Sequence, residues 1–510
     1  MVASAEGPAA KSGFSARLEQ PDLFLTAVEV QPGLAGKGGS LESARRALDL
    51  AAVGGVDLIC LTDCAGGRPR LRPEAVARHF AGADVNYSIT LSCKDVSRNG
   101  LETRLLEAAD AGCLNLIAVS GDYPAAGFRG GSKPVFDVDS VGLLEMVRDM
   151  NARTGANFYP GAVVNPFKWI EGEAVAQYLK LAMKLRAGAR FVVSQIGFDA
   201  RKLDELPRYA RIKGIDTPLI ASVALLNAKA AAALARGAVP GVTLPAELAA
   251  SAEREARSRD HGGGWFEELA ARQIAVARGL GYRGVYLSGV ARPDRLASVL
   301  KRAASYSGAD WRSFLDLLPT RTRAFYYFEL DPATGLNSSD ERERPLRKKR
   351  SQLAYRLGKA AHRYVFTPNT RGFRLGQRLY SNAGPSRQRT LHAFELAAKS
   401  AMYECRDCGD CSLAEIAFLC PESQCPKNQR NGPCGGTKNG MCEVGVRHCI
   451  WVRAYYRLKA DGNELLMLER EPTVKDGTLQ GTSAWRNAFL GRDHTCSVAR
   501  QTPSGGSLQP

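Results

Sequence analysis

The sequence predicts an α/β protein, a (β/α)8 TIM barrel followed by a small Cys-rich metal-binding domain. Eight short apolar segments alternate with helical patterns between Phe24 and Ser305, and their number and spacing match one eightfold barrel. Eight cysteines between Cys405 and Cys449 predict the second domain. The 510 residues exceed one ordinary hydrophobic core. A doubly wound open sheet is the alternative for the first domain.

The composition excludes several protein classes. Hydrophobic residues make up 45% and charged residues 24%, which is typical of a globular chain and excludes disordered and collagenous ones. No apolar run reaches about 18 residues, so no membrane span is predicted. The N-terminus lacks the apolar core of a secretory signal, and we therefore expect a cytoplasmic protein.

The barrel is predicted over residues 22–305, after a flexible tail at 1–21 that is small and polar. Its strands are expected at 24–30, 56–62, 87–93, 114–120, 157–164, 190–196, 218–225 and 283–289. Several of the intervening helices end in glycine just before the next strand, which favours a C-cap. These glycines are Gly55, Gly112, Gly188, Gly214 and Gly281.

The charge is concentrated after the barrel. The chain has a net charge of +17, and residues 341–392 alone contain 14 Lys and Arg but only 2 Asp and Glu. We interpret 306–394 as a basic connector that is a solvated arm, docks an acidic redox partner or binds the polyglutamate tail of folate. No recognised nucleic-acid fold or repeating basic pattern accompanies it, so no nucleic-acid partner is expected. Residues 461–510 are predicted to be an irregular tail.

Polar residues follow the predicted strands, where barrel enzymes carry their chemistry. Glu29 ends the first strand, and Thr62 ends the second before a Gly-containing turn. Gly121 and Asp122 follow the fourth strand, and Gln195 ends the sixth. Gly-rich turns let backbone N–H groups approach a phosphate or a flat ring.

These segments, VEVQPG, LTDCAGG, SGDYP and AGARFVVSQIGFD, resemble the methylenetetrahydrofolate reductase family in order and strand placement. The resemblance covers 22–305. It implies a flavin-dependent enzyme that reduces 5,10-methylenetetrahydrofolate to 5-methyltetrahydrofolate, or runs the reverse reaction, with hydride passing through flavin N5. The implied partners are a folate substrate and NAD(P)H or another electron donor, and an oligomer is compatible with the sequence.

The resemblance also implies roles for individual residues. Glu29 would be the general acid that opens the folate bridge, and a raised pKa would suit it to that role. The other implied roles are catalysis and flavin tuning by Asp122, substrate binding by Gln195 and Phe198, and flavin contacts by Thr62, Gly121, Asp122 and Lys184. Thr90 and Met183 depart from the family pattern, which leaves FAD and FMN both open.

The cysteine module has the spacing of a metal site. Cys-x2-Cys-x2-Cys is the ferredoxin-like run of a [4Fe–4S] cluster, while zinc sites also use paired x2 spacings. Eight thiolates suffice for two four-ligand sites. The candidate ligands are Cys405, Cys408, Cys411, Cys420, Cys425, Cys434, Cys442 and Cys449. Among the remaining cysteines, Cys60, Cys93 and Cys113 are expected to be small buried packing residues.

Residues 395–460 also resemble a known module, the Cys-rich C-terminal domain found with some methylenetetrahydrofolate reductases. The segments CRDCGDCSL, CPESQCPK and NGPCGGTKNGMCEV carry this resemblance. It implies an electron-transfer or structural accessory to the barrel. The alternatives are a non-catalytic pterin-binding assembly module with a structural metal domain, and a pterin-dependent methyltransferase barrel.

Overall fold

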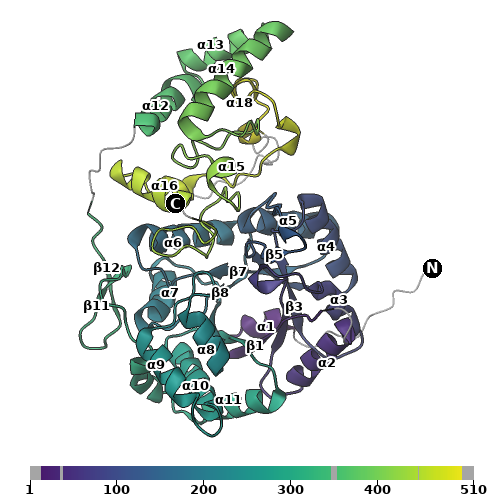
Figure 1. Ribbon diagram of the computed structural model, residues 1–510, viewed down its shortest axis with the longest axis vertical. Helices are drawn as coiled ribbons and strands as arrows, with labels where there is room; N and C mark the ends of the chain where they lie inside the picture. Colours follow the sequence, from purple (N-terminus) through teal and green to yellow (C-terminus); the bar gives the residue numbers. More distant parts are fainter. Residues whose placement is uncertain (1–12, 35–37, 346–352, 446, 497–510) are drawn as a thin grey trace, which may run out of the picture.

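The computed structural model describes residues 13–34, 38–345, 353–445 and 447–496. Eight parallel strands close into a barrel in the order β1-β10-β9-β8-β7-β4-β3-β2 (Figure 1). The strands are β1 (Leu25–Val30), β2 (Leu58–Leu61), β3 (Tyr87–Ser92), β4 (Asn115–Val119), β7 (Tyr159–Val164), β8 (Phe191–Ser194), β9 (Leu219–Ala224) and β10 (Gly284–Ser288). The predicted TIM barrel is confirmed.

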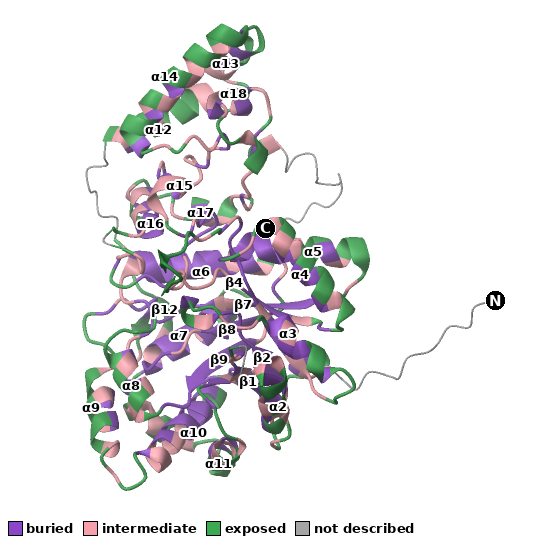
Figure 2. Cartoon of the chain, turned by 45° about the vertical axis from the view of Figure 1, so that its right-hand side comes forward, coloured by how far each residue is buried: buried purple, intermediate pink, exposed green. Residues whose placement is uncertain are grey.

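Alternation along each strand divides the barrel core into two parts, because successive side chains point to opposite faces. On β1, Ala27 belongs to an inner cluster with Leu58, Ile117 and Phe191. Val28 points outward into the larger cluster between the strands and the surrounding helices. The strands are accordingly buried almost throughout (Figure 2).

Helices surround the barrel and return the chain from each strand to the next. They are α2 (Gly39–Ala51), α3 (Pro73–Ala77), α4 (Arg98–Asp110), α5 (Ser140–Thr154), α6 (Glu171–Arg186), α7 (Ala200–Ile212), α8 (Ala228–Ala235), α9 (Ala246–Glu255), α10 (Gly263–Gly279) and α11 (Pro293–Ser305). The five glycines predicted to follow helices all have positive φ, between 63° and 115°, as a left-handed C-cap requires. A two-stranded ribbon, β5 (Ala126–Gly127) and β6 (Gly130–Gly131), follows β4.

The prediction of a flexible N-terminal tail is wrong for residues 13–21. Residues 13–21 include helix α1 (Phe14–Leu18), whose Phe14 and Leu18 are buried in the inner cluster. The Phe14 ring packs edge-on against Phe191, with the ring centroids 5.6 Å apart. Two apolar side chains therefore suffice to dock this short helix on the barrel. Residues 1–12 lie outside the described part of the chain.

The predicted basic connector is also folded rather than an arm. It contains η3 (Asp310–Leu317), the hairpin β11 (Phe328–Leu330) and β12 (Asn337–Glu341), α12 (Leu353–Ala361), the π-helical turn η4 (His362–Phe366) and α13 (Arg371–Ser381). Helix α14 (Pro385–Tyr403) leads to the first cysteine of the module. In Figure 1, α12, α13 and α14 lie at the end of the molecule farthest from the barrel.

The C-terminal region contains α15 (Pro421–Gln424), α16 (Ile450–Ala460), α17 (Leu466–Glu469), η5 (Gly477–Leu479) and α18 (Ala484–Phe489). The prediction of an irregular tail after 460 is therefore wrong up to residue 496, since Met467 and Phe489 are buried. Residues 497–510 lie outside the described part. Helix α16 packs against α6, where the Tyr455 hydroxyl donates to Glu171 at 2.6 Å (Figures 1 and 2).

None of the helices in the described part of the chain combines the length and apolar character needed to cross a bilayer.

Candidate active site at the barrel mouth

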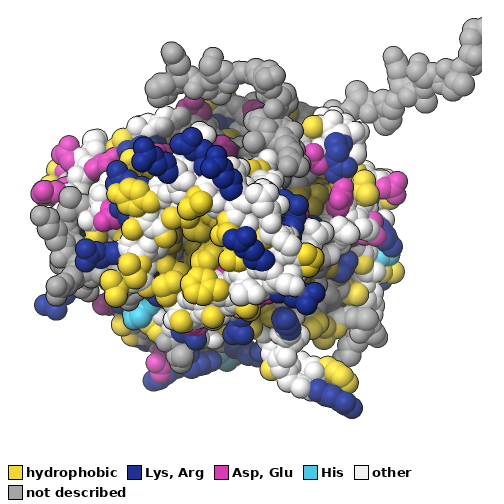
Figure 3. All heavy atoms as spheres, turned by 90° about the horizontal axis from the view of Figure 1, so that it is seen from above, with side chains coloured by type: hydrophobic (Ala, Val, Ile, Leu, Met, Phe, Trp, Pro, Cys, Tyr) yellow, Lys and Arg dark blue, Asp and Glu magenta, His cyan; other side chains and the backbone are white. Residues whose placement is uncertain are grey.

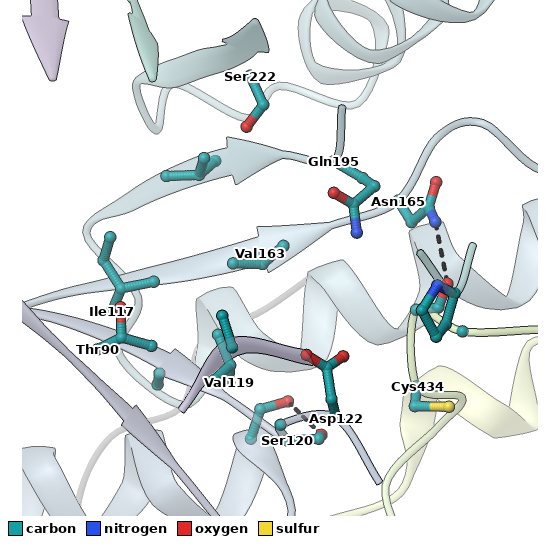
Figure 4. A pocket seen from close by; sticks show the side chains of 18 of the residues that line it. Thr90, Ile117, Val119, Ser120, Asp122, Val163, Asn165, Gln195, Ser222 and Cys434 are labelled. Carbon is teal, nitrogen blue, oxygen red and sulfur yellow. Dashed lines mark hydrogen bonds between the residues drawn. The ribbon is translucent and has the colours of Figure 1, made fainter. Parts of the chain in front are cut away.

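A cavity of about 290 Å³ lies at the C-terminal ends of the barrel strands. Side chains from several strands and the loops after them point into it (Figure 4). Glu29, Thr62, Gly121, Asp122, Lys184 and Gln195, all predicted from the sequence, line this cavity. Residues up to 166 positions apart thus meet at one site because parallel strands in a barrel all end at the same rim.

Glu29 is a carboxyl group on β1 that lines the cavity. Burial raises the pKa of its carboxyl group, and a hydrogen bond from Tyr286 only partly opposes this rise. The Tyr286 hydroxyl on β10 donates to Glu29 Oε2 at 3.1 Å. A carboxyl group whose pKa is raised in this way holds its proton closer to neutral pH. Sequence reasoning missed Tyr286, although a hydroxyl among aliphatic strand neighbours was a usable signal.

Asp122 and Gln195 point into the same cavity from different loops (Figure 4). Asp122 Oδ2 accepts a hydrogen bond from Gly66 N at 2.7 Å, which ties the loop after β4 to the turn after β2. Gln195 Oε1 accepts from Ile196 N at 2.9 Å. This bond fixes the orientation of the Gln195 amide, whose NH2 group can donate to a ligand.

Thr62 and Gly121 form a section of the wall suited to a flat ligand. Thr62 Oγ1 is buried and has no hydrogen-bond partner among the described residues. Buried hydroxyl groups are normally paired, so this atom is suited to a ligand group. Gly121 has φ +85°, and a Cβ atom there would lie 3.0 Å from the Cβ of Ser92. Glycine therefore allows the loop after β4 to pack closely against Ser92.

Lys184 lines the cavity, but its ammonium group is already used. Lys184 Nζ donates to Val163 O at 2.5 Å. Burial lowers the Lys184 pKa to about 7, and the nearby Lys180 contributes to this shift. The contact of Lys184 with cofactor phosphates stays a prediction, and phosphate binding there would require this bond to be exchanged.

Phe198 differs from its prediction as a substrate contact. Its side chain is only 2% exposed and belongs to the hydrophobic core around the barrel. It does not line the cavity at the barrel mouth; it borders a separate pocket together with Phe167 and Trp169. The apolar ring packs in the core rather than at the polar rim, and a substrate contact of Phe198 stays a prediction.

The C-terminal domain supplies one wall of the cavity. We call residues 425–443 the capping loop. Cys434 and five other residues of this loop line the cavity beside the barrel side chains. Figure 4 shows Cys434 on this wall. These five are Lys427, Pro433, Gly435, Gly436 and Glu443. Lys427 and Glu443 form a buried ion pair, and Lys427 Nζ also donates to Gly121 O at 2.7 Å. The site is thus shared between the two domains.

Buried barrel side chains hold the capping loop by its backbone carbonyl groups. The bonds are Asn165 Nδ2 to Gly435 O (2.9 Å), Lys168 Nζ to Gly435 O (2.7 Å) and Thr437 O (2.5 Å), Gln177 Nε2 to Cys434 O (2.9 Å), and Lys180 Nζ to Gly432 O (3.1 Å). Two loop N–H groups donate back, from Asn431 to Asp139 at 2.9 Å and from Gly440 to Glu173 at 2.8 Å. Reciprocal bonds among buried groups make this a fixed contact.

The eight cysteines fall into two groups of four along the chain. The first group, Cys405, Cys408, Cys411 and Cys420, lines one small cavity under α14. The second group, Cys425, Cys434, Cys442 and Cys449, belongs to the capping loop and the start of α16. Burial raises the Cys425 pKa to about 12, and the charges of Cys434 and Cys442 add to the rise. The members of each group are therefore near neighbours.

Among the described residues, no three Cys, His, Asp or Glu side chains are placed so that they would hold a metal ion. The metal assignments stay predictions. Cys60, Cys93 and Cys113 are buried, which confirms their predicted packing role.

The sequence of each domain matches a family model. Residues 36–263 match the model described as methylenetetrahydrofolate reductase, and residues 385–476 match the model described as methylene-tetrahydrofolate reductase C terminal. The chain belongs to the methylenetetrahydrofolate reductase family. Both resemblances found in the sequence are thereby confirmed, and the barrel is a folate-related enzyme domain of this family.

Solved structures similar to this methylenetetrahydrofolate reductase family member share little sequence with it. One is an uncharacterised protein from Clostridium thermocellum, described as binding two copies of 5-methyl-5,6,7,8-tetrahydrofolic acid (10% identity, TM-score 0.40, covering 56% of this chain and 96% of that one). Another is dihydropteroate synthase from Stenotrophomonas maltophilia (13% identity, TM-score 0.34, covering 58% and 98%). Among curated proteins, no sequence matches the chain.

Proposed function

We propose that the protein is a flavin-dependent reductase that converts 5,10-methylenetetrahydrofolate to 5-methyltetrahydrofolate. The observation that carries this proposal is the Glu29 carboxyl group, whose pKa is raised by burial and which lies in one cavity with Asp122 and Gln195. A carboxyl group that holds its proton suits the opening of the folate bridge, and the Gln195 amide and the Asp122 carboxylate can hydrogen-bond a pterin.

Glu29 delivers the proton in this mechanism. Its protonated carboxyl group donates to a nitrogen of the methylene bridge, which opens the bridge to an electrophilic iminium. Tyr286 holds Glu29 Oε2 and so orients the carboxyl group. The Gln195 NH2 group donates to the pterin, while Asp122 accepts from its amino group. The wall formed by Lys427 and Glu443 excludes water from one side.

A bound flavin supplies the hydride, as flavins do in reductases. The residues present fit a flavin in two respects. Thr62 Oγ1 is a buried hydroxyl without a partner among the described residues, and the Gly121 backbone, in a conformation that favours glycine, lines the same cavity. Asp122, which lies in the loop after β4, would tune the flavin electronics. FAD and FMN are both compatible with these contacts.

We further propose that the two cysteine groups bind iron–sulfur clusters or zinc. Thiols buried with raised pKa values stay protonated unless a cation compensates the thiolate charge, and metal binding provides that compensation. Four thiols around one small cavity are a donor set that suits either occupant. Loading is expected to draw each set of four sulfurs together.

The test is the half-reaction in the absence of an external donor. The protein is purified without oxygen and loaded with flavin, and 5-methyltetrahydrofolate is added while the flavin absorbance is followed. We expect the absorbance to bleach as the folate is oxidised. Failure of the loaded protein to bleach, with folate binding intact, would argue against the reductase. Metal analysis and the visible spectrum then distinguish iron–sulfur clusters from zinc, because zinc has no visible band.

A further inference from the structure

The outer face of helices α12, α13 and α14 carries several large exposed apolar side chains. Figure 3 shows hydrophobic side chains gathered over this end of the molecule, with Lys and Arg beside them. Leu353 is 69% exposed and Phe394 66% exposed. The large exposed apolar side chains of this face are Leu353, Leu357, Tyr364, Leu375, Phe394 and Met402. A cluster of this kind marks an interaction site.

The charges on the same face have a single sign. Eight charged side chains are exposed between Leu353 and Tyr403, and all eight are Lys or Arg: Arg356, Lys359, Arg363, Arg371, Arg374, Arg378, Arg387 and Arg389. The one acidic residue of this stretch, Glu395, is buried and bonded to Lys399 and Ser483. Among the described residues, Lys359 pairs with Asp461, while the seven arginines form no ion pair.

The mixture of the two kinds of side chain favours a protein partner. On α13, Arg371, Leu375 and Arg378 follow one another at helical spacing, so basic and apolar groups share one face. A membrane-surface helix separates its apolar face from its basic one. Arginine and aromatic side chains interspersed on one surface are instead typical of the centre of protein interfaces. Charge complementarity makes the partner acidic.

The position of this face also indicates what the partner does. The buried side of α14 carries Lys399 and Tyr403, which line the cavity of the first cysteine group. One helix, about 10 Å across, therefore separates a docked partner from Cys405, Cys408, Cys411 and Cys420. Electron-transfer encounters use small interfaces, below about 1,200 Å², steered by opposite charge.

We propose that the α12–α14 face is the docking surface of a small acidic electron-carrier protein. Binding of the carrier to this face does not depend on the chemistry of the barrel, whereas electron delivery to the barrel rests on the proposed reductase function. Each docking event oxidises the carrier by one electron, which a [4Fe–4S] cluster held by the first cysteine group would accept. Two such events and two protons from solvent balance the reduction of one methylene bridge to a methyl group.

The test uses the full-length protein, loaded with flavin and metal, and an acidic two-cluster bacterial ferredoxin as the probe. Binding is measured by biolayer interferometry at low and high salt. We expect R371E/R374E/R378E to weaken binding by at least about tenfold, since reversing rim charges removes electrostatic steering. The matched control R254E/R257E/R259E, on exposed positions at and after α9, should change binding by less than about twofold. F394A tests the apolar contribution without a change in charge.

Turnover separates this proposal from the proposed function. With ferredoxin as donor, R371E/R374E/R378E should lose most folate reduction, while turnover driven by a reduced viologen should persist. Absence of viologen-driven turnover in the wild-type protein refutes the reductase but leaves the binding result valid. The docking proposal is overturned if ferredoxin does not bind, if the control variant loses binding equally, or if phosphatidylserine vesicles or duplex DNA bind more tightly than ferredoxin.

Discussion

The two groups of four cysteines have similar chemistry but different surroundings. The first group lies under α14, at the end of the molecule away from the barrel, and borders only C-terminal residues. The second group belongs to the capping loop and the start of α16, and its Cys434 lines the barrel cavity. Cysteine spacing alone therefore does not define a role. We infer that the first group faces a partner and the second completes the active site.

The largest loss of turnover is expected from a substitution in the barrel cavity, which the second cysteine group helps to form. Glu29→Gln removes the proton donor while keeping the size and hydrogen-bonding capacity of the side chain. Folate turnover should fall by about 10²- to 10⁴-fold, the usual contribution of a general acid. Steady-state assays with a reduced viologen measure this loss, and flavin absorbance checks that the cofactor is retained. Glu253→Gln, an exposed position on α9, is the control and should leave turnover unchanged.

The next largest effect is a loss of stability when the hydrogen bonds between the capping loop and the barrel are removed. Lys168→Met removes the donor to Gly435 O and Thr437 O, after which Thr437 O loses this buried bond and Gly435 O keeps only the one from Asn165. We expect the free energy of unfolding in urea to fall by about 1–3 kcal/mol. Lys213→Met, which breaks an exposed pair with Glu341, should cost less than about 1 kcal/mol. Equal costs would mean that the capping loop is not fixed by these bonds.

A smaller effect is expected from Tyr286→Phe. The hydrogen bond from Tyr286 lowers the pKa of Glu29 against the opposing effect of burial, so its loss should raise that pKa further. Because the protonated carboxyl group is the active acid, turnover falls as pH rises through this pKa. The alkaline limb of the pH–rate profile should therefore move up by about half to one pH unit, from a hydrogen bond of about 1 kcal/mol. A downward shift would contradict the role of Glu29 as acid.

Much of the barrel was predictable because its determinants are local. Strand period, helix period and glycine C-caps such as Gly55 and Gly188 each depend on a few neighbouring residues. The strand ends then placed Glu29, Asp122 and Gln195 at one rim, since every parallel strand ends on the same side. The site residues of the barrel followed from topology rather than from direct sequence signals.

The rest depended on contacts that sequence spacing does not encode. The bond between Asn165 and Gly435 joins residues 270 positions apart, so the capping loop was not predictable as a wall of the cavity. Helix α1 is too short for its period to distinguish it from a tail, and only the docking of Phe14 reveals it. Phe198 follows Gln195 closely in sequence, yet the chain turns its ring into the core.

The most direct test of the account compares the two cysteine groups in one titration. Full-length protein is loaded with flavin, reduced without oxygen so that the flavin cannot oxidise the added folate, and titrated with 5-methyltetrahydrofolate, and the dissociation constant is measured by isothermal titration calorimetry. We predict that C425S/C434S weakens folate binding by at least about tenfold, because the cavity loses a fixed wall and with it preorganisation. The C405S/C408S variant should bind folate within about twofold of wild type, since its cysteines do not line the cavity. Equal effects of the two double variants would contradict the division of roles.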